Sequence, residues 1–140
     1  MALSGYVFAE PSEIVPFLEK PSKGPTSTLA AELAARLRCH VIAGYPEELD
    51  EKTETVGQVP NGTANGLAED KIAPPPPPGV GYNSALLASP AGEIIGNYRK
   101  TFLFETDKIW SREGDGFSYF DLPEPLGRVS IGICMGECLF

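Results

Sequence analysis

The stretch from Pro46 to Gly79 most limits what this chain of 140 residues can fold into. It holds seven acidic residues, two Asn-Gly pairs and the proline run Pro74 to Pro78, but few large apolar side chains. Such a composition buries too little apolar surface to offset the chain entropy lost on folding. We therefore expect residues 46–79 to be a disordered, Pro-rich acidic insertion within one domain spanning residues 1–140, and to end in an extended polyproline spacer.

Composition also excludes several classes of partner. The formal net charge of −8 opposes binding to nucleic acid, which requires a basic surface, and no basic cluster is present to bind anionic lipid. No stretch approaches the roughly 20 consecutive apolar residues of a membrane span, and the first residues do not form a signal peptide. Three cysteines give no disulfide framework. We expect a cytoplasmic protein without nucleic-acid or membrane partners, and composition says nothing of its oligomeric state.

Before the insertion, the pattern predicts a helix followed directly by a strand. Leucines recur at every fourth position from Ser27 to Arg38, with alanines beside them, which predicts a helix with one apolar stripe. The residues of this stripe are Leu29, Ala30, Leu33, Ala34 and Leu37. Thr26, Ser27 and Thr28 are candidate N-caps for the helix. Residues 39–45 then predict a short buried strand, and this order is typical of a layered α/β fold.

After the insertion the sequence favours β-structure. Residues 83–88 and 93–99 are two β-like runs around the turn sequence Ser-Pro-Ala-Gly, which predicts a hairpin. A polar loop should cover residues 101–116, and a further strand should lie at 117–122. The β-branched residues of segment 128–134 predict a buried strand that ends at its cysteine.

Two residues stand at the ends of predicted strands and suit nucleophilic chemistry. Cys134 is followed by a predicted tight turn, whose next backbone amide can donate to an oxyanion as it forms. Lys100 in a partly dry site would stabilise a thiolate and the same oxyanion. The alternatives are a buried structural cysteine and a solvated surface lysine, respectively.

The sequence predicts no metal site and no cofactor. The single histidine, His40, neighbours Cys39 in a predicted strand, where adjacent side chains point to opposite faces. Cys134 and Cys138 lack the second pair of ligands that a tetrahedral zinc site needs.

Taken together, the segments around these two residues resemble a known family. Asn97 to Phe104 (NYRKTFLF) and Gly132 to Met135 (GICM) closely resemble the lysine and cysteine motifs of the nitrilase, or carbon–nitrogen hydrolase, superfamily. Gly81 to Ala85 (GYNSA) at the start of the hairpin resembles the fungal protein N-terminal amidase branch. So does the pattern after the lysine, which consists of Trp110, Glu113-Gly114 and Gly116-Phe117.

The resemblance implies a fold and a set of catalytic roles. The fold would be part of a four-layer α-β-β-α sandwich, without its first strand and its C-terminal half. Cys134 would be the nucleophile, Lys100 the electrostatic stabiliser and the Met135 amide an oxyanion donor. Glu113 would be the second glutamate of the family, with Glu105 as its rival, and an exposed loop carboxylate is the alternative for both. No metal or cofactor is implied.

The resemblance also implies a substrate. The family hydrolyses non-peptide C–N bonds in linear amides, and this branch acts on N-terminal asparagine or glutamine of proteins. The general-base glutamate would immediately precede Met1, so we expect this chain to be a fragment that is inactive alone. One alternative is another amidase branch that acts on small amides or nitriles. A second is a non-catalytic remnant that binds a partner through Pro74 to Pro78.

Overall fold

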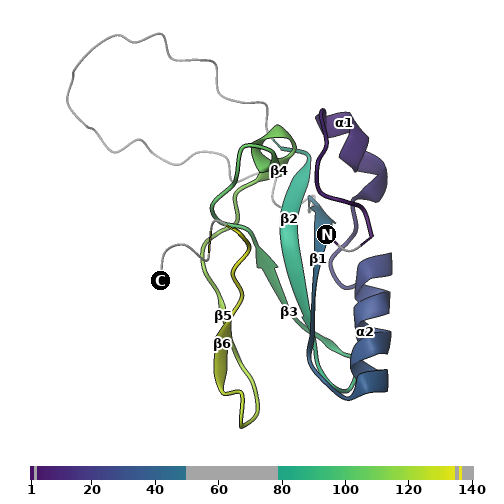
Figure 1. The fold of residues 1–140 in the computed structure, drawn as a ribbon, viewed down its shortest axis with the longest axis vertical. Helices are drawn as coiled ribbons and strands as arrows, with labels where there is room; N and C mark the ends of the chain where they lie inside the picture. Colours follow the sequence, from purple (N-terminus) through teal and green to yellow (C-terminus); the bar gives the residue numbers. More distant parts are fainter. Residues whose placement is uncertain (2, 50–78, 135, 137–140) are drawn as a thin grey trace, which may run out of the picture.

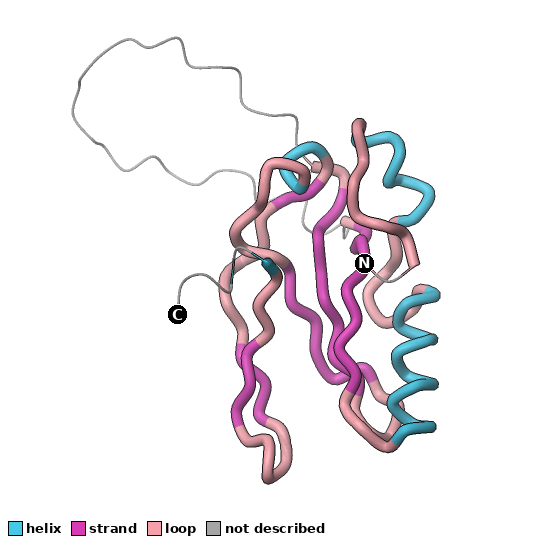
Figure 2. The backbone as a smooth tube through the Cα atoms, viewed as in Figure 1, coloured by secondary structure: helices cyan, strands magenta, loops and turns pink. Residues whose placement is uncertain are grey.

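The computed structural model describes residues 1, 3–49, 79–134 and 136. A layer of helices covers one face of an antiparallel sheet, and a separate two-stranded hairpin lies on the other side of that sheet (Figure 1). Figure 2 shows the same arrangement as a backbone tube, with the helical layer in cyan and the strands in magenta. Residues 50–78, the greater part of the predicted insertion, lie outside the described residues.

The main sheet has the order β1-β2-β3, formed by β1 (Val41–Glu48), β2 (Gly81–Ala88) and β3 (Ile94–Arg99). All neighbours on this path are antiparallel, and the two-residue β4 (Ser111–Arg112) pairs in parallel with the start of β2. Every residue of the central strand β2 is buried. The predicted hairpin at 83–99 is thus confirmed, because its alternation and its turn sequence are both local signals.

A second, two-stranded sheet pairs β5 (Tyr119–Asp121) with β6 (Arg128–Ser130). The strand predicted at 117–122 is confirmed as the shorter β5. The buried strand predicted at 128–134 is wrong in length and burial, because β6 ends at Ser130 and none of its residues is fully buried. Val129, the β-branched residue of β6, is only half-buried and lies outside the main sheet, whereas Ile131, just beyond the strand, is buried.

Three short helical elements form the other layer: α1 (Pro11–Ile14), the 3₁₀ turn η1 (Val15–Phe17) and α2 (Pro25–Leu37). The predicted helix is confirmed as α2, but none of its predicted caps is used. The N-cap is Gly24, followed by Pro25 at the first helical position. Glu19 accepts hydrogen bonds from the Thr26 backbone N–H (2.9 Å) and hydroxyl (2.7 Å). A carboxylate from the segment just before the helix therefore satisfies its positive end.

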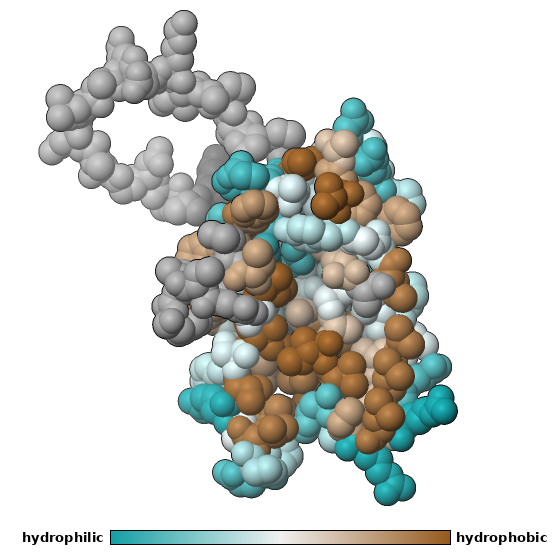
Figure 3. All heavy atoms as spheres, in the orientation of Figure 1, coloured by the Kyte–Doolittle hydropathy of each residue, from teal (hydrophilic) through white to brown (hydrophobic). Residues whose placement is uncertain are grey.

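The apolar stripe of α2 is only partly correct. Ala30 and Ala34 are buried in one cluster with Tyr45 and two residues of β2, because small side chains let the helix approach the sheet closely. The leucines of the stripe are exposed instead, from 38% at Leu33 to 63% at Leu37. Figure 3 shows apolar side chains at the surface along α2. No helix in the described part of the chain is long and apolar enough to cross a bilayer.

The start predicted for the insertion is also wrong. β1 continues through Pro46, Glu47 and Glu48, and Glu47 is completely buried. Composition treats acidic residues as solvated, whereas the fold gives this carboxylate a set of buried polar partners. The ordered strand therefore extends three residues into the predicted insertion.

Candidate active site

Lys100 directly follows β3 and lies beside β2. Its backbone N–H donates to the carbonyl oxygen of Asn83 (2.8 Å), which extends the pairing of β2 and β3 by one residue. Its side chain has no exposed area, so it is not a solvated surface lysine. The pairing of β2 with β3 thus places the ammonium group of Lys100 in the interior, at the end of the sheet.

Asp107 is the ion-pair partner of Lys100. It opens the 3₁₀ turn η3 (Asp107–Ile109), and its Oδ2 accepts a hydrogen bond from Lys100 Nζ. Oδ2 also accepts from the Phe104 backbone N–H (2.9 Å), while Oδ1 accepts from Asn83 Nδ2 (2.9 Å). Burial alone raises the pKa of Asp107, but these hydrogen bonds, that from Lys100 foremost, outweigh it and hold the pKa below its usual value. The ammonium therefore faces an ionised carboxylate.

Cys134 lies in a turn four residues beyond β6, and the residue is exposed. It is therefore not a buried structural cysteine. Its φ of 51° falls in the left-handed region, which is uncommon for a residue with a side chain and occurs at functional turns. Met135, whose amide is the predicted oxyanion donor, lies outside the described residues.

The segment around Cys134 packs against the end of β3. Ile131 belongs to a buried cluster that contains Tyr98, two residues before Lys100. A side-chain carbon added to Gly136 would lie 3.5 Å from the Tyr98 hydroxyl and 3.4 Å from the Phe117 ring. The residues on both sides of Cys134 are thus anchored near Lys100. That the two side chains converge on one pocket remains a prediction.

The two candidate glutamates lie on the loop after Lys100. The backbone N–H of Gly114 donates to the carbonyl oxygen of Lys100 (2.9 Å), which brings the neighbouring Glu113 beside it. The side chain of Glu113 is exposed. Glu105 is 79% exposed and pairs with Lys108 on the surface (2.7 Å). Backbone contact favours Glu113, and its catalytic role stays a prediction.

Glu47 organises a second buried polar network next to this site, which the sequence did not reveal. Its carboxylate accepts from Ser84 Oγ (2.6 Å), from Asn97 Nδ2 (2.8 Å) and from the Arg99 guanidinium. Burial lowers the pKa of Arg99, but the Glu47 carboxylate more than compensates and the net effect is upward. Burial, followed by the charge of Glu47, raises the pKa of Tyr45. This network ties β1, β2 and β3 together one residue before Lys100.

Sequence reasoning also missed Asp107 and Asn83. Asn83 and Asp107 are 24 positions apart along the chain, and no local periodicity marks either of them. Only the tertiary structure brings the turn η3 to the strand β2, so no pattern within one segment would have found this pair.

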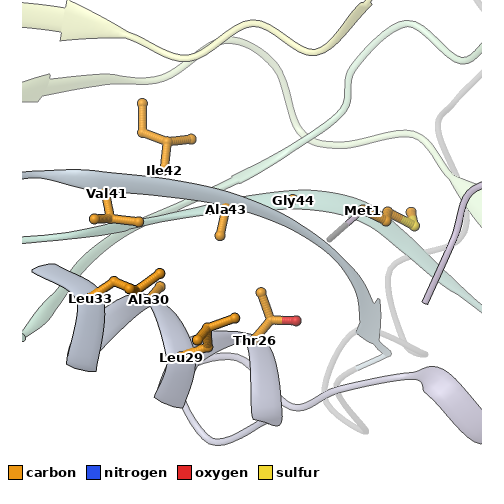
Figure 4. A pocket seen from close by; sticks show the side chains of 9 residues that line it. All are labelled: Met1, Thr26, Leu29, Ala30, Leu33, Val41, Ile42, Ala43 and Gly44. Atoms are coloured by element: carbon orange, nitrogen blue, oxygen red, sulfur yellow. The ribbon is translucent and has the colours of Figure 1, made fainter. Parts of the chain in front are cut away.

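A groove between α2 and the edge of β1 is a separate feature (Figure 4). The residues that line it are Met1, Thr26, Leu29, Ala30, Leu33, Val41, Ile42, Ala43 and Gly44. It contains none of the predicted catalytic residues and is mostly apolar, so it is not a candidate active site. Among the described residues, no three His, Cys, Asp or Glu side chains gather as metal ligands would.

The sequence was then compared with known protein families, and one family matches. Residues 1–138 match the profile of the carbon–nitrogen hydrolase family. The chain belongs to this family. Its predicted α/β class and its relation to the nitrilase-type fold are confirmed by a crystal structure of an N-terminal amidase. That structure superposes with a TM-score of 0.69 and 32% identity, over 96% of this chain and 29% of that one. Further crystal structures hold that amidase with an Asn-Glu peptide and with a Gln-Gly peptide.

Two similar proteins are N-terminal amidases from yeasts. The protein N-terminal amidase of Schizosaccharomyces pombe is 36% identical over 137 residues, which cover 96% of this chain and 40% of that protein. That of Saccharomyces cerevisiae is 32% identical over 151 residues, or 96% and 27% of the two chains. A nitrilase of Pyrococcus abyssi is 28% identical over 131 residues, or 93% and 37%. This chain therefore spans well under half the length of these relatives.

Proposed function

We propose that this chain forms part of a protein N-terminal amidase, which hydrolyses the side-chain amide of N-terminal asparagine or glutamine. The observation that carries the proposal is the completely buried side chain of Lys100, together with the packing of the segment around the exposed Cys134 against Tyr98, two residues before Lys100. Similarity to the two yeast amidases, and to the amidase that binds Asn- and Gln-initiated peptides, supports this substrate class. The bond cleaved is the side-chain carboxamide C–N bond, and the peptide bond is left intact.

The proposed reaction has two steps. The Cys134 thiolate attacks the side-chain carboxamide carbon, and the oxyanion that forms is stabilised by the Lys100 ammonium and the Met135 amide. The C–N bond then breaks, and ammonia leaves with a proton from a general acid. Water adds to the resulting thioester, and the C–S bond breaks to give a carboxylate and the free thiol. Glu113 is proposed to assist from the loop beside Lys100.

The substrate class is best tested in a chimera. The chimera carries this chain in place of the matching segment of the S. pombe amidase, which supplies the remaining 60% of that protein. We expect ammonia release from peptides that begin with Asn or Gln, and none from the same peptides acetylated at the N-terminus. Release that is equally fast from free small amides or nitriles would instead favour a nitrilase-type activity, as in the P. abyssi relative.

The 140-residue chain alone belongs in the same assay. Its predicted inactivity would be contradicted by ammonia release that disappears in a Cys134→Ala variant. The predicted cytoplasmic location is independent of this assay and stays a prediction.

The assignment of the second glutamate gives a further prediction. In the chimera, Glu113→Gln should lower kcat by about 10²-fold, because a group that assists proton transfer is lost. Glu105→Gln is the matched control, since it removes another exposed loop carboxylate, whose partner is Lys108. Its kcat should remain within about twofold of the unmodified chimera. The reverse ranking of the two variants would move the role to Glu105.

A further inference from the structure

We infer that Asp107 is the positioning residue for Lys100: it provides the buried counter-charge of the ammonium group and fixes the direction in which its free N–H groups point. This inference rests on the proposed function, in which Lys100 stabilises the oxyanion. None of the sequence motifs includes Asp107, and its role follows from its contacts alone.

Burial is the first reason. The side chains of Lys100 and Asp107 both have no exposed area. A lone buried ammonium loses its hydration and would be driven towards its neutral form, so it stays charged only beside an opposite charge. A buried ion pair also contributes little net stability, because apolar residues of similar size often give a fold that is equally or more stable. The pair therefore requires a reason beyond holding the loop in place.

Rigidity is the second reason. Asp107 is held on both carboxylate oxygens, by Asn83 Nδ2 and by the Phe104 backbone N–H, at 2.9 Å each. Asn83 lies on the central strand β2, so its hydrogen bond fixes the carboxylate to the most buried strand of the sheet. A lysine side chain is flexible by itself, and this fixed acceptor removes its freedom at the charged end.

Direction is the third reason. An ammonium group has three N–H donors, and Asp107 is the only hydrogen-bond partner of Nζ among the described residues. One donor is thus held by Asp107, which leaves two for the oxyanion and for the general base. The carboxylate acts on the substrate only through Lys100, so we describe it as positioning and not as catalytic.

The direct test uses the 140-residue chain with ¹⁵N-labelled lysine. NMR should show one ammonium signal, absent in Lys100→Met, that exchanges its hydrogens far more slowly than those of exposed lysines. In Asp107→Asn, exchange should accelerate roughly 10- to 100-fold, as the loss of a hydrogen bond between charged groups implies. Asp121→Asn is the matched control, because it removes an exposed Asp–Arg pair in the β5–β6 hairpin. An unchanged exchange rate in folded Asp107→Asn would overturn the inference.

The catalytic consequence is tested in the chimera. Asp107→Asn should lower kcat by about 10²-fold with KM within about twofold, because the lost interaction acts in the transition state. A purely structural role would lower the melting temperature and leave kcat of the folded enzyme unchanged, and that result would refute the inference. If Asp107→Asn does not fold, Asn83→Ala tests the inference instead. This variant removes the Asn83 hydrogen bond that holds the Asp107 carboxylate and keeps the carboxylate's charge. It should accelerate ammonium exchange and lower kcat by about tenfold.

Failure of the inference and failure of the proposed function are distinguishable. An unmodified chimera that releases no ammonia counts against the proposed function. The exchange experiment still decides whether Asp107 holds the ammonium of Lys100. An active chimera whose kcat is insensitive to Asp107→Asn counts against the inference alone.

Discussion

Replacement of Cys134 by alanine is expected to abolish ammonia release by the chimera, with a loss on the order of 10⁴-fold or more in kcat. The reason is that alanine has no thiol with which to form the proposed thioester. Neighbouring residues would still bind substrate and polarise its carbonyl group, but attack would depend on water. The measurement is ammonia release from an Asn-initiated peptide, together with mass spectrometry of the enzyme for the covalent intermediate.

Cys39→Ala provides the matched control for this experiment. Cys39 is the other free cysteine of the described residues and is exposed like Cys134. It lies between the end of α2 and the start of β1, in neither of the two family motifs. Its replacement should leave kcat unchanged. Activity that survives in Cys134→Ala, or is lost in Cys39→Ala, would show that the nucleophile has been assigned wrongly.

Replacement of Lys100 by methionine should destabilise the 140-residue chain by about 3–5 kcal/mol, because it leaves the buried carboxylate of Asp107 without its counter-charge. Adding Asp107→Asn should restore most of this loss, since the uncompensated charge is then removed. Urea denaturation monitored by the fluorescence of Trp110, which is buried, would measure both variants. Lys108→Met is the control, because that lysine is paired only at the surface and should have no measurable effect.

The same ion pair predicts how stability depends on pH. The pKa of Asp107 is held below its usual value of 3.8, so the folded state binds its proton less readily than the unfolded state does. The contribution of this group is therefore fully present above about pH 4 and is lost as pH falls through the lower, folded-state pKa. The free energy of unfolding should fall in that acidic range. The fall should be smaller in the Lys100→Met/Asp107→Asn double variant, and an equal fall in both would contradict this assignment.

Much of the fold could be predicted because its signals are local. The spacing of alanine and leucine in residues 27–38 predicts α2, and alternation around a turn sequence predicts the β2–β3 hairpin. Lys100 could be singled out from its motif and its place at a strand end. These features depend on neighbours within a few residues, so the sequence alone contains them.

Other features depended on partners that are distant along the chain. Glu47 and Arg99 are 52 positions apart, and the acidic composition around Glu47 suggested a solvated loop. Only the pairing of β1 with β2 and of β2 with β3 buries this carboxylate among its donors. The same is true of Asn83 and Asp107, whose buried hydrogen bond joins the core strand β2 to the turn η3.

The sequence by itself determined the family, the elements of the sheet and helix, and the two residues that suit nucleophilic chemistry. The tertiary structure alone decided which side of α2 is buried, because the close approach of the sheet admits alanine and excludes the leucines. It also decided where the strand β1 ends and which carboxylate neutralises Lys100. Burial of a charge is a property of the whole fold: its free energy depends on whether opposite charges and donors from other strands reach it, and no single segment encodes that.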